Sequence, residues 1–194
     1  SEGQGYEKDL TGEIGLKSRA QVFVLNGTGK VAWRDLGRLP NHAKTVAAYR
    51  ELVTAIDARD LDGRLVALQD GGYQWVEKGQ AAPEGSRPET VPSGSAPTVH
   101  ALRVLQRYWH DTLIKPLLPL TEAYNRWIIS PDKDLALLPF DTLPETLTAK
   151  GDADKLLAEQ RNISLVQSFS VYALLKKREV EYANLRRPKS LLAM

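Results

Sequence analysis

Three histidines are the first residues to consider, because an imidazole can act as a base or a metal ligand near neutral pH. The 194-residue chain contains His42, His100 and His110. His100 and His110 are ten residues apart on one expected helix, which places them on different faces. None of the three has metal-ligand spacing to another histidine or to a carboxylate motif. We therefore expect no metal site.

The groups that could act as a nucleophile are limited, because the chain has no cysteine. It therefore has no disulfide, no thiolate metal ligand and no cysteine nucleophile. A serine triad that uses His110 and Asp132 stays open, but there is no Gly-x-Ser-x-Gly elbow. Gly27-Thr28-Gly29-Lys30 differs from a phosphate-binding loop, since Val31 and a strand follow the lysine. The sequence thus assigns no catalytic residue to this chain.

Three polar residues follow a short apolar run, residues 127–129, that we expect to be a strand. They are Ser130, Asp132 and Asp134. Aspartates in a tight turn commonly bond their own backbone, and that structural interpretation stays open. Open α/β sheets, however, bind ligands outside the carboxyl ends of their parallel strands. We therefore take Ser130 and Asp132 as candidate substrate-binding residues.

The first 63 residues predict a β-hairpin and a helix. Two apolar, β-rich runs at residues 21–25 and 30–33 flank Asn26-Gly27, and Asn-Gly is a strong hairpin signal. A helix is expected to begin at Pro40-Asn41 and to end near residues 59–63. Its apolar stripe has helical spacing and consists of Val46, Tyr49, Leu52, Val53 and Ile56.

Residues 64–98 predict irregular structure. Gly71-Gly72 interrupts the stretch, and residues 81–97 are rich in Pro, Ser, Gly and Glu. Such a composition buries too little apolar area to offset its ordering entropy, so we expect a mobile loop or linker. An exposed loop of this kind is also a preferred site of proteolysis.

The remaining residues predict an alternation of helices and strands. A helix over residues 98–113 should bury one face and end at Pro116 and Pro119. Further expected elements are strands at 127–129, 163–166 and 190–194, an apolar run at 135–140, and helices at 152–159 and 170–182. The helix at 170–182 should turn one face toward the core, and that face consists of Val171, Leu174, Leu175 and Tyr182. This alternation is typical of a parallel sheet covered on both faces. Because the chain stops on a strand, we expect further strands to complete that sheet.

Composition narrows the class of protein. Hydrophobic residues make up 42% and charged residues 26%, with a net charge of +2. That balance indicates a globular domain and gives no electrostatic reason to expect binding to nucleic acid or an anionic membrane. No apolar run approaches the roughly 18 residues of a membrane span. Residues 1–5 do not read as a signal peptide. We expect a soluble, cytoplasmic protein.

A family resemblance rests on five blocks in order. They are residues 113–118, 126–132, 135–143, 163–171 and 189–194. The most specific is the strand and turn followed by Leu-Ala-Leu-Leu-Pro-Phe at 135–140. Together they resemble the CHAT domain, a caspase-like cysteine peptidase family named for its association with TPR repeats. The hairpin at residues 22–37 and the helix after it resemble the region that commonly precedes this domain.

The resemblance implies a fold and an activity. The fold would be a caspase-like three-layer α/β sandwich with a mainly parallel sheet, incomplete in this chain. It would begin after residues 1–63 and the linker of residues 64–98, and residues 99–194 would form its first part. The activity would be peptide-bond hydrolysis by a His/Cys dyad, both members of which lie beyond this chain.

The same resemblance implies partners. They are the C-terminal catalytic half of the peptidase, TPR or other sensor domains, and a protein substrate, in a bacterial cytoplasm and without a cofactor. This chain would supply scaffold and part of the substrate pocket, with Ser130 and Asp132. Two alternatives stay open: a catalytically dead interaction module of the same fold, and an unrelated small α/β ligand-binding domain.

Overall fold

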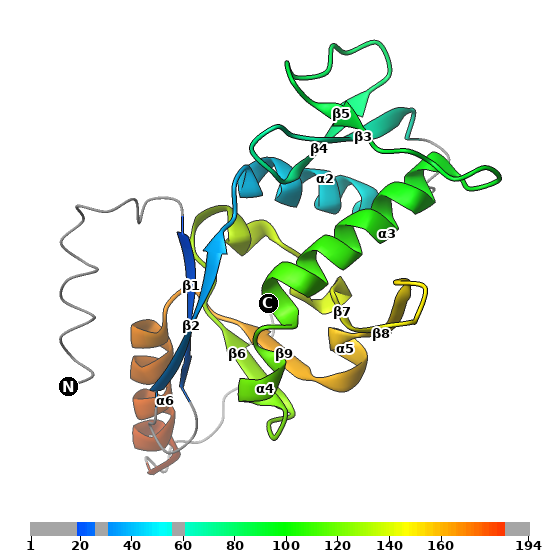
Figure 1. Cartoon of the computed structure of the whole chain (residues 1–194). Coiled ribbons are helices and arrows are strands. Elements are labelled where there is room, and N and C mark those ends of the chain that lie inside the picture. The colour runs from blue at the N-terminus through cyan, green and yellow to red at the C-terminus, as the bar shows by residue number, and fades with distance from the viewer. Residues whose placement is uncertain (1–18, 26–30, 56–60, 185–194) are drawn as a thin grey trace, which may run out of the picture.

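The computed structural model describes residues 19–25, 31–55 and 61–184, and within them the chain is a mixed α/β protein with four small sheets (Figure 1). Strands β1 (Arg19–Leu25) and β2 (Val31–Arg38) pair in antiparallel fashion, with Phe23 opposite Trp33. This pairing confirms the predicted hairpin. Its Asn26-Gly27 turn lies outside the described residues.

Helix α2 (His42–Thr54) confirms the predicted amphipathic helix. Its buried residues follow a helical period: Thr45, Val46, Ala48, Tyr49 and Leu52. Asn41 precedes the helix with a left-handed backbone, φ 52°, which asparagine tolerates better than most residues. The helix ends at Thr54, earlier than residues 59–63, where the sequence predicts its end.

Residues 63–77 correct the expectation of irregular structure. Strands β3 (Gly63–Ala67) and β4 (Tyr73–Glu77) form an antiparallel hairpin, and the two-residue strand β5 (Arg87–Pro88) pairs with the other edge of β3. Gly71 and Gly72 form the turn with φ of 95° and 75°, so they connect two strands rather than break structure. Most of residues 81–97 are exposed, and their mobility stays a prediction.

A long helix lies across this hairpin and α2. Helix α3 (Pro97–Trp109) continues into a π-helical turn, η2 (His110–Ile114), as predicted for residues 98–113. After Pro116 a short helix, α4 (Leu118–Thr121), follows. Apolar side chains of α2, α3, the β3–β4 hairpin and residues 138–157 form one core: Val46, Tyr49, Leu52, Leu65, Trp75, Leu105, Trp109, Leu138, Phe140, Leu143 and Leu157.

The parallel part of the fold is a pair of four-residue strands. Strand β6 (Arg126–Ile129) pairs with β9 (Asn162–Leu165), and Trp127 lies opposite Ile163. Both strands were predicted from their apolar residues. Parallel strands need a crossover connection, and residues 130–161 supply it.

The crossover differs from its prediction in two places. The apolar run at 135–140 lies in two 3₁₀ turns, η3 (Lys133–Leu137) and η4 (Phe140–Thr142). The helix predicted over residues 152–159 is wrong in its first half, where β8 (Ala153–Leu156) pairs with β7 (Pro144–Leu147). Only the short α5 (Leu157–Gln160) is helical. Strand pairing overrides the helix propensity of this segment.

Helix α6 (Phe169–Asn184) has the predicted position, but its predicted burial is wrong. Val171, Leu174, Leu175 and Tyr182 are 49–59% exposed rather than turned into a core. Figure 1 draws α6 apart from the core around α2 and α3. The strand predicted at residues 190–194 lies outside the described residues. Within the described part of the chain, no helix combines the length and apolarity needed to cross a bilayer.

Candidate functional site

The carboxyl ends of β6 and β9 bring together residues that follow the two strands. The amide of Val166 donates to the carbonyl of Ile129 at 2.9 Å, so the pairing reaches the last residue of β6. Ser130 comes next, half-buried, and its Oγ lies 3.4 Å from the carbonyl oxygen of Gln167. Ser130 therefore lies at the edge where parallel sheets bind their ligands, as its position after a strand predicts.

Asp132 lies two residues further along the same turn and is exposed. Its carbonyl accepts a hydrogen bond from the amide of Leu135 at 3.2 Å, but its carboxylate makes no capping hydrogen bond to η3. The carboxylate of Asp132 is thus not engaged in capping its own turn. It is available to a ligand at this edge.

Asp134 reaches a residue that the sequence did not connect with it. Its Oδ2 lies 3.3 Å from Nε2 of His42, the first residue of α2, and Nδ1 of His42 lies 3.1 Å from the carbonyl oxygen of Leu39. Both ring nitrogens therefore face oxygen acceptors. A ring that carries hydrogen on both nitrogens can donate to both. No motif links these positions in the sequence, because only the packing of α2 on η3 brings them together.

A second contact joins α2 to the same crossover segment. The hydroxyl of Tyr49 donates to the carbonyl oxygen of Thr142 at 2.9 Å, and the hydroxyl of Thr142 donates to the carbonyl oxygen of Pro139 at 2.9 Å. Burial raises the pKa of Tyr49 to about 12, although its hydrogen bond to Thr142 acts in the opposite direction. The hydroxyl of Tyr49 therefore stays protonated at pH values well above the ordinary tyrosine pKa of 10.0.

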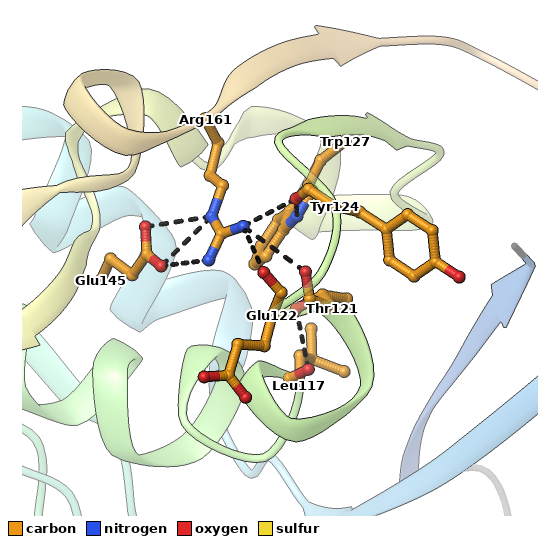
Figure 2. Close-up of polar contacts among 7 residues, drawn as sticks. All are labelled: Leu117, Thr121, Glu122, Tyr124, Trp127, Glu145 and Arg161. Atoms are coloured by element: carbon orange, nitrogen blue, oxygen red, sulfur yellow. Dashed lines mark hydrogen bonds and ion pairs between the residues drawn. The ribbon is translucent and has the colours of Figure 1, made fainter.

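The opposite end of the two strands is held by a buried arginine (Figure 2). Arg161 precedes β9, and its Nε lies 3.2 Å from each carboxylate oxygen of Glu145, while its Nη2 donates to Oε1 at 2.5 Å. The two side chains are only 9% and 10% exposed. Figure 2 shows the guanidinium between this carboxylate on β7 and the segment that leads from α4 into β6.

The remaining donors of Arg161 are also occupied. Its Nη1 donates to the carbonyl oxygen of Tyr124 at 2.7 Å and lies 3.4 Å from those of Thr121 and Glu122, at the end of α4. The guanidinium carbon lies 5.4 Å from the ring centre of Trp127. A guanidinium with its donors used in this way acts as a structural clamp. It aligns the starts of β6 and β9.

An open pocket of about 310 Å³ lies beside this clamp. Its lining consists of Leu118, Pro119, Glu122, Glu145 and Arg161. It lies at the amino ends of the parallel strands, whereas ligands of open α/β sheets bind at the carboxyl ends. Because Arg161 and Glu145 already satisfy each other, the residues at this end of the strands act as a structural support.

The other two histidines form no site together. Nδ1 of His110 lies 3.2 Å from Asp111 Oδ1, its neighbour in η2, and Nε2 of His100 is buried without a hydrogen-bond partner. Over residues 19–25, 31–55 and 61–184, no three His, Asp or Glu side chains are grouped as a metal site requires.

The edge formed by Ser130 and Asp132 therefore offers a hydroxyl and an uncapped carboxylate, both of which can form hydrogen bonds. The segment after this edge, residues 133–142, is held by two contacts from α2, one through His42 and one through Tyr49. Comparison of the chain with protein-family models, with curated proteins and with solved structures finds no match.

Proposed function

We propose that this chain is the N-terminal, non-catalytic part of a caspase-like CHAT cysteine peptidase of the bacterial cytoplasm. The complete peptidase hydrolyses peptide bonds, and it forms when this chain is joined by the half that bears the His/Cys dyad. The observation that carries the proposal is the β6–β9 pair, two short parallel strands with Ser130 and Asp132 at their carboxyl end. Parallel sheets normally have several strands covered on both faces.

The exposed face of α6 supports the same proposal. α6 directly follows β9, which is the position of a crossover helix in a β-α-β unit. A crossover helix packs its apolar face on the sheet, yet Leu174 and Leu175 are 49% and 57% exposed. Contiguous exposed apolar residues are typical of interaction surfaces. We assign this face of α6 to the strands of the catalytic half.

The residue types indicate which groups this chain and its partner would each supply to the complete enzyme. A thiolate nucleophile must come from the partner, because this chain has no cysteine. The resemblance to the CHAT family assigns the histidine of the dyad to the same partner. Ser130 and Asp132 would contact the substrate peptide from this side of the pocket. TPR repeats or another sensor domain would control access to the assembled enzyme.

The test is to co-express this chain with the segment encoded after residue 194 and to measure hydrolysis of a fluorogenic peptide mixture. The chain alone should be inactive, the pair should cleave, and replacing the partner's motif cysteine by alanine should abolish cleavage. The proposal fails if the following segment encodes no His and Cys motifs, or if a folded complex carrying both leaves every peptide intact.

The alternative function is a catalytically dead interaction module of the same fold. The exposed face of α6 suits that function as well, since it requires a partner but no chemistry. A stable complex whose partner lacks the thiol would favour this alternative.

A further inference from the structure

The His42–Asp134 contact joins two residues that each follow a non-glycine residue with positive φ. Asn41, with φ 52°, and Lys133, with φ 49°, are the non-glycine residues with positive φ among those described. Asn41 directly precedes His42, and Lys133 directly precedes Asp134. Asparagine tolerates this conformation, but for lysine it is uncommon and persists where surrounding contacts enforce it, and strained residues of this kind are frequent at functional sites.

The contact that joins the two turns is the His42–Asp134 pair, with Nε2 and Oδ2 3.3 Å apart. The ring of His42 cannot turn freely, because its other nitrogen contacts the carbonyl oxygen of Leu39 at 3.1 Å. Asp134 in turn lies at the start of η3, which α2 contacts closely. The pair therefore ties the first residue of a long, packed helix to the turn after β6.

We propose that His42 and Asp134 are positioning residues that hold the turn of residues 130–134 in its substrate-binding conformation. This inference rests on the proposed function, because it gives the turn a peptide to bind. The turn is fixed at one end by the β6–β9 ladder and by the contact of Ser130 with Gln167. The His42–Asp134 pair fixes the other end, so Asp132 lies between two anchors.

Helix α2 can serve as the rigid support, because a second residue on the same face makes a second contact. Tyr49 lies seven residues after His42, which is almost two full helical turns. Its hydroxyl holds Thr142, at the far end of the 3₁₀ segment, at 2.9 Å. The whole segment of residues 133–142 is thus attached to one helix at both ends.

The first test uses this chain alone and reads amide hydrogen exchange by NMR. The amides of Leu135 and Leu138 donate to the carbonyls of Asp132 and Leu135, so they report on η3. His42→Ala and Asp134→Ala should each accelerate their exchange about threefold, the size expected for losing one partly exposed pair. His42→Gln keeps an amide donor near the carboxylate and should restore part of the protection.

Arg103→Gln is the matched control. It breaks the Arg103–Asp152 pair, which has a 3.1 Å contact and side chains 49% and 37% exposed, close to the 37% and 46% of His42 and Asp134. It should leave exchange at Leu135 and Leu138 unchanged. Equal exchange in wild type, His42→Ala and Asp134→Ala would overturn the proposal, and so would equal acceleration by Arg103→Gln.

The second test uses the complete enzyme with its catalytic half and a fluorogenic peptide. His42→Ala should raise KM severalfold and leave kcat almost unchanged, because the residue positions a binding turn and touches no reacting atom. A fall in kcat with constant KM would contradict the positioning role. If the wild-type complex cleaves nothing, the proposed function fails, whereas the exchange results still decide whether the pair holds the turn.

Discussion

At the scale of single residues, two side-chain contacts lie at opposite ends of the parallel strands and differ in burial. Arg161 and Glu145 are buried at the amino end, whereas His42 and Asp134 are partly exposed near the carboxyl end. A buried pair that loses one member leaves an uncompensated charge, whereas a partly exposed member is rehydrated by water. The Arg161 clamp should therefore dominate stability, and the His42 pair should affect the turn.

Replacing Arg161 by alanine should lower the free energy of unfolding by about 3 kcal/mol, because Glu145 and the carbonyl oxygens at the end of α4 lose their donors. Urea unfolding followed by circular dichroism measures this loss. Lys78→Ala is the control, since Lys78 pairs with Asp62 on the surface with both side chains mostly exposed. Its effect on stability should be much smaller than that of Arg161→Ala, because water replaces an exposed ion pair at little cost. Equal losses in the two variants would contradict the clamp.

At the scale of elements, the predicted and observed structures differ for identifiable reasons. The periodic apolar residues of α2 and α3 and the Ile-Ile run of β6 predicted those elements correctly, because one buried face leaves a readable period. The β3–β4 hairpin was missed because a Gly-Gly turn resembles a break and each strand has two adjacent buried residues rather than alternation.

The tertiary contacts could not be read from local patterns at all. Residues 153–156 favour a helix locally, and only pairing with β7 makes them a strand. The position of Ser130 after a strand could be predicted because it is a local property, whereas its role in substrate binding stays a prediction. The His42–Asp134 contact, by contrast, depends on how α2 packs, and the apolar stripe of α6 revealed its amphipathic character but not what covers it.

The burial of Tyr49 gives a prediction about alkaline pH. Tyr49 keeps its proton up to a pKa of about 12 in the folded chain, while an unfolded tyrosine ionises near its ordinary value of 10.0. Its contribution is therefore fully present below pH 10 and is lost as the pH rises from 10 to about 12. The loss should be on the order of 2 kcal/mol.

Tyr49→Phe tests this assignment. At pH 7 the variant should be less stable by about 1 kcal/mol, because the hydrogen bond to Thr142 is lost. Above pH 10 its stability should fall less steeply than that of the wild type, as urea unfolding at a series of pH values would show. Burial also raises the pKa of Tyr73 and Tyr108, so some alkaline sensitivity should remain in the variant. Parallel pH profiles would contradict the role of Tyr49.

At the scale of the whole molecule, the chain combines a well-packed region with an open one. Around α2 and α3 the side chains of Tyr49, Leu105 and Trp109 are fully buried. At the β6–β9 pair and α6, short parallel strands and an exposed apolar helix lie together in sequence. Such a contrast is expected of an α/β sheet that is only partly assembled. Completion of this sheet by a partner is the central claim of the proposed function.

The most direct test is hydrogen exchange of this chain with and without the proposed catalytic half. Amides of β6, β9 and α6 should become strongly protected in the complex, while those of α3 should change little. The opposite result would be that α6 and both strands exchange as in the free chain, and that only the β3–β4 hairpin or residues 81–97 become protected. That result would contradict the completion of this sheet by a partner.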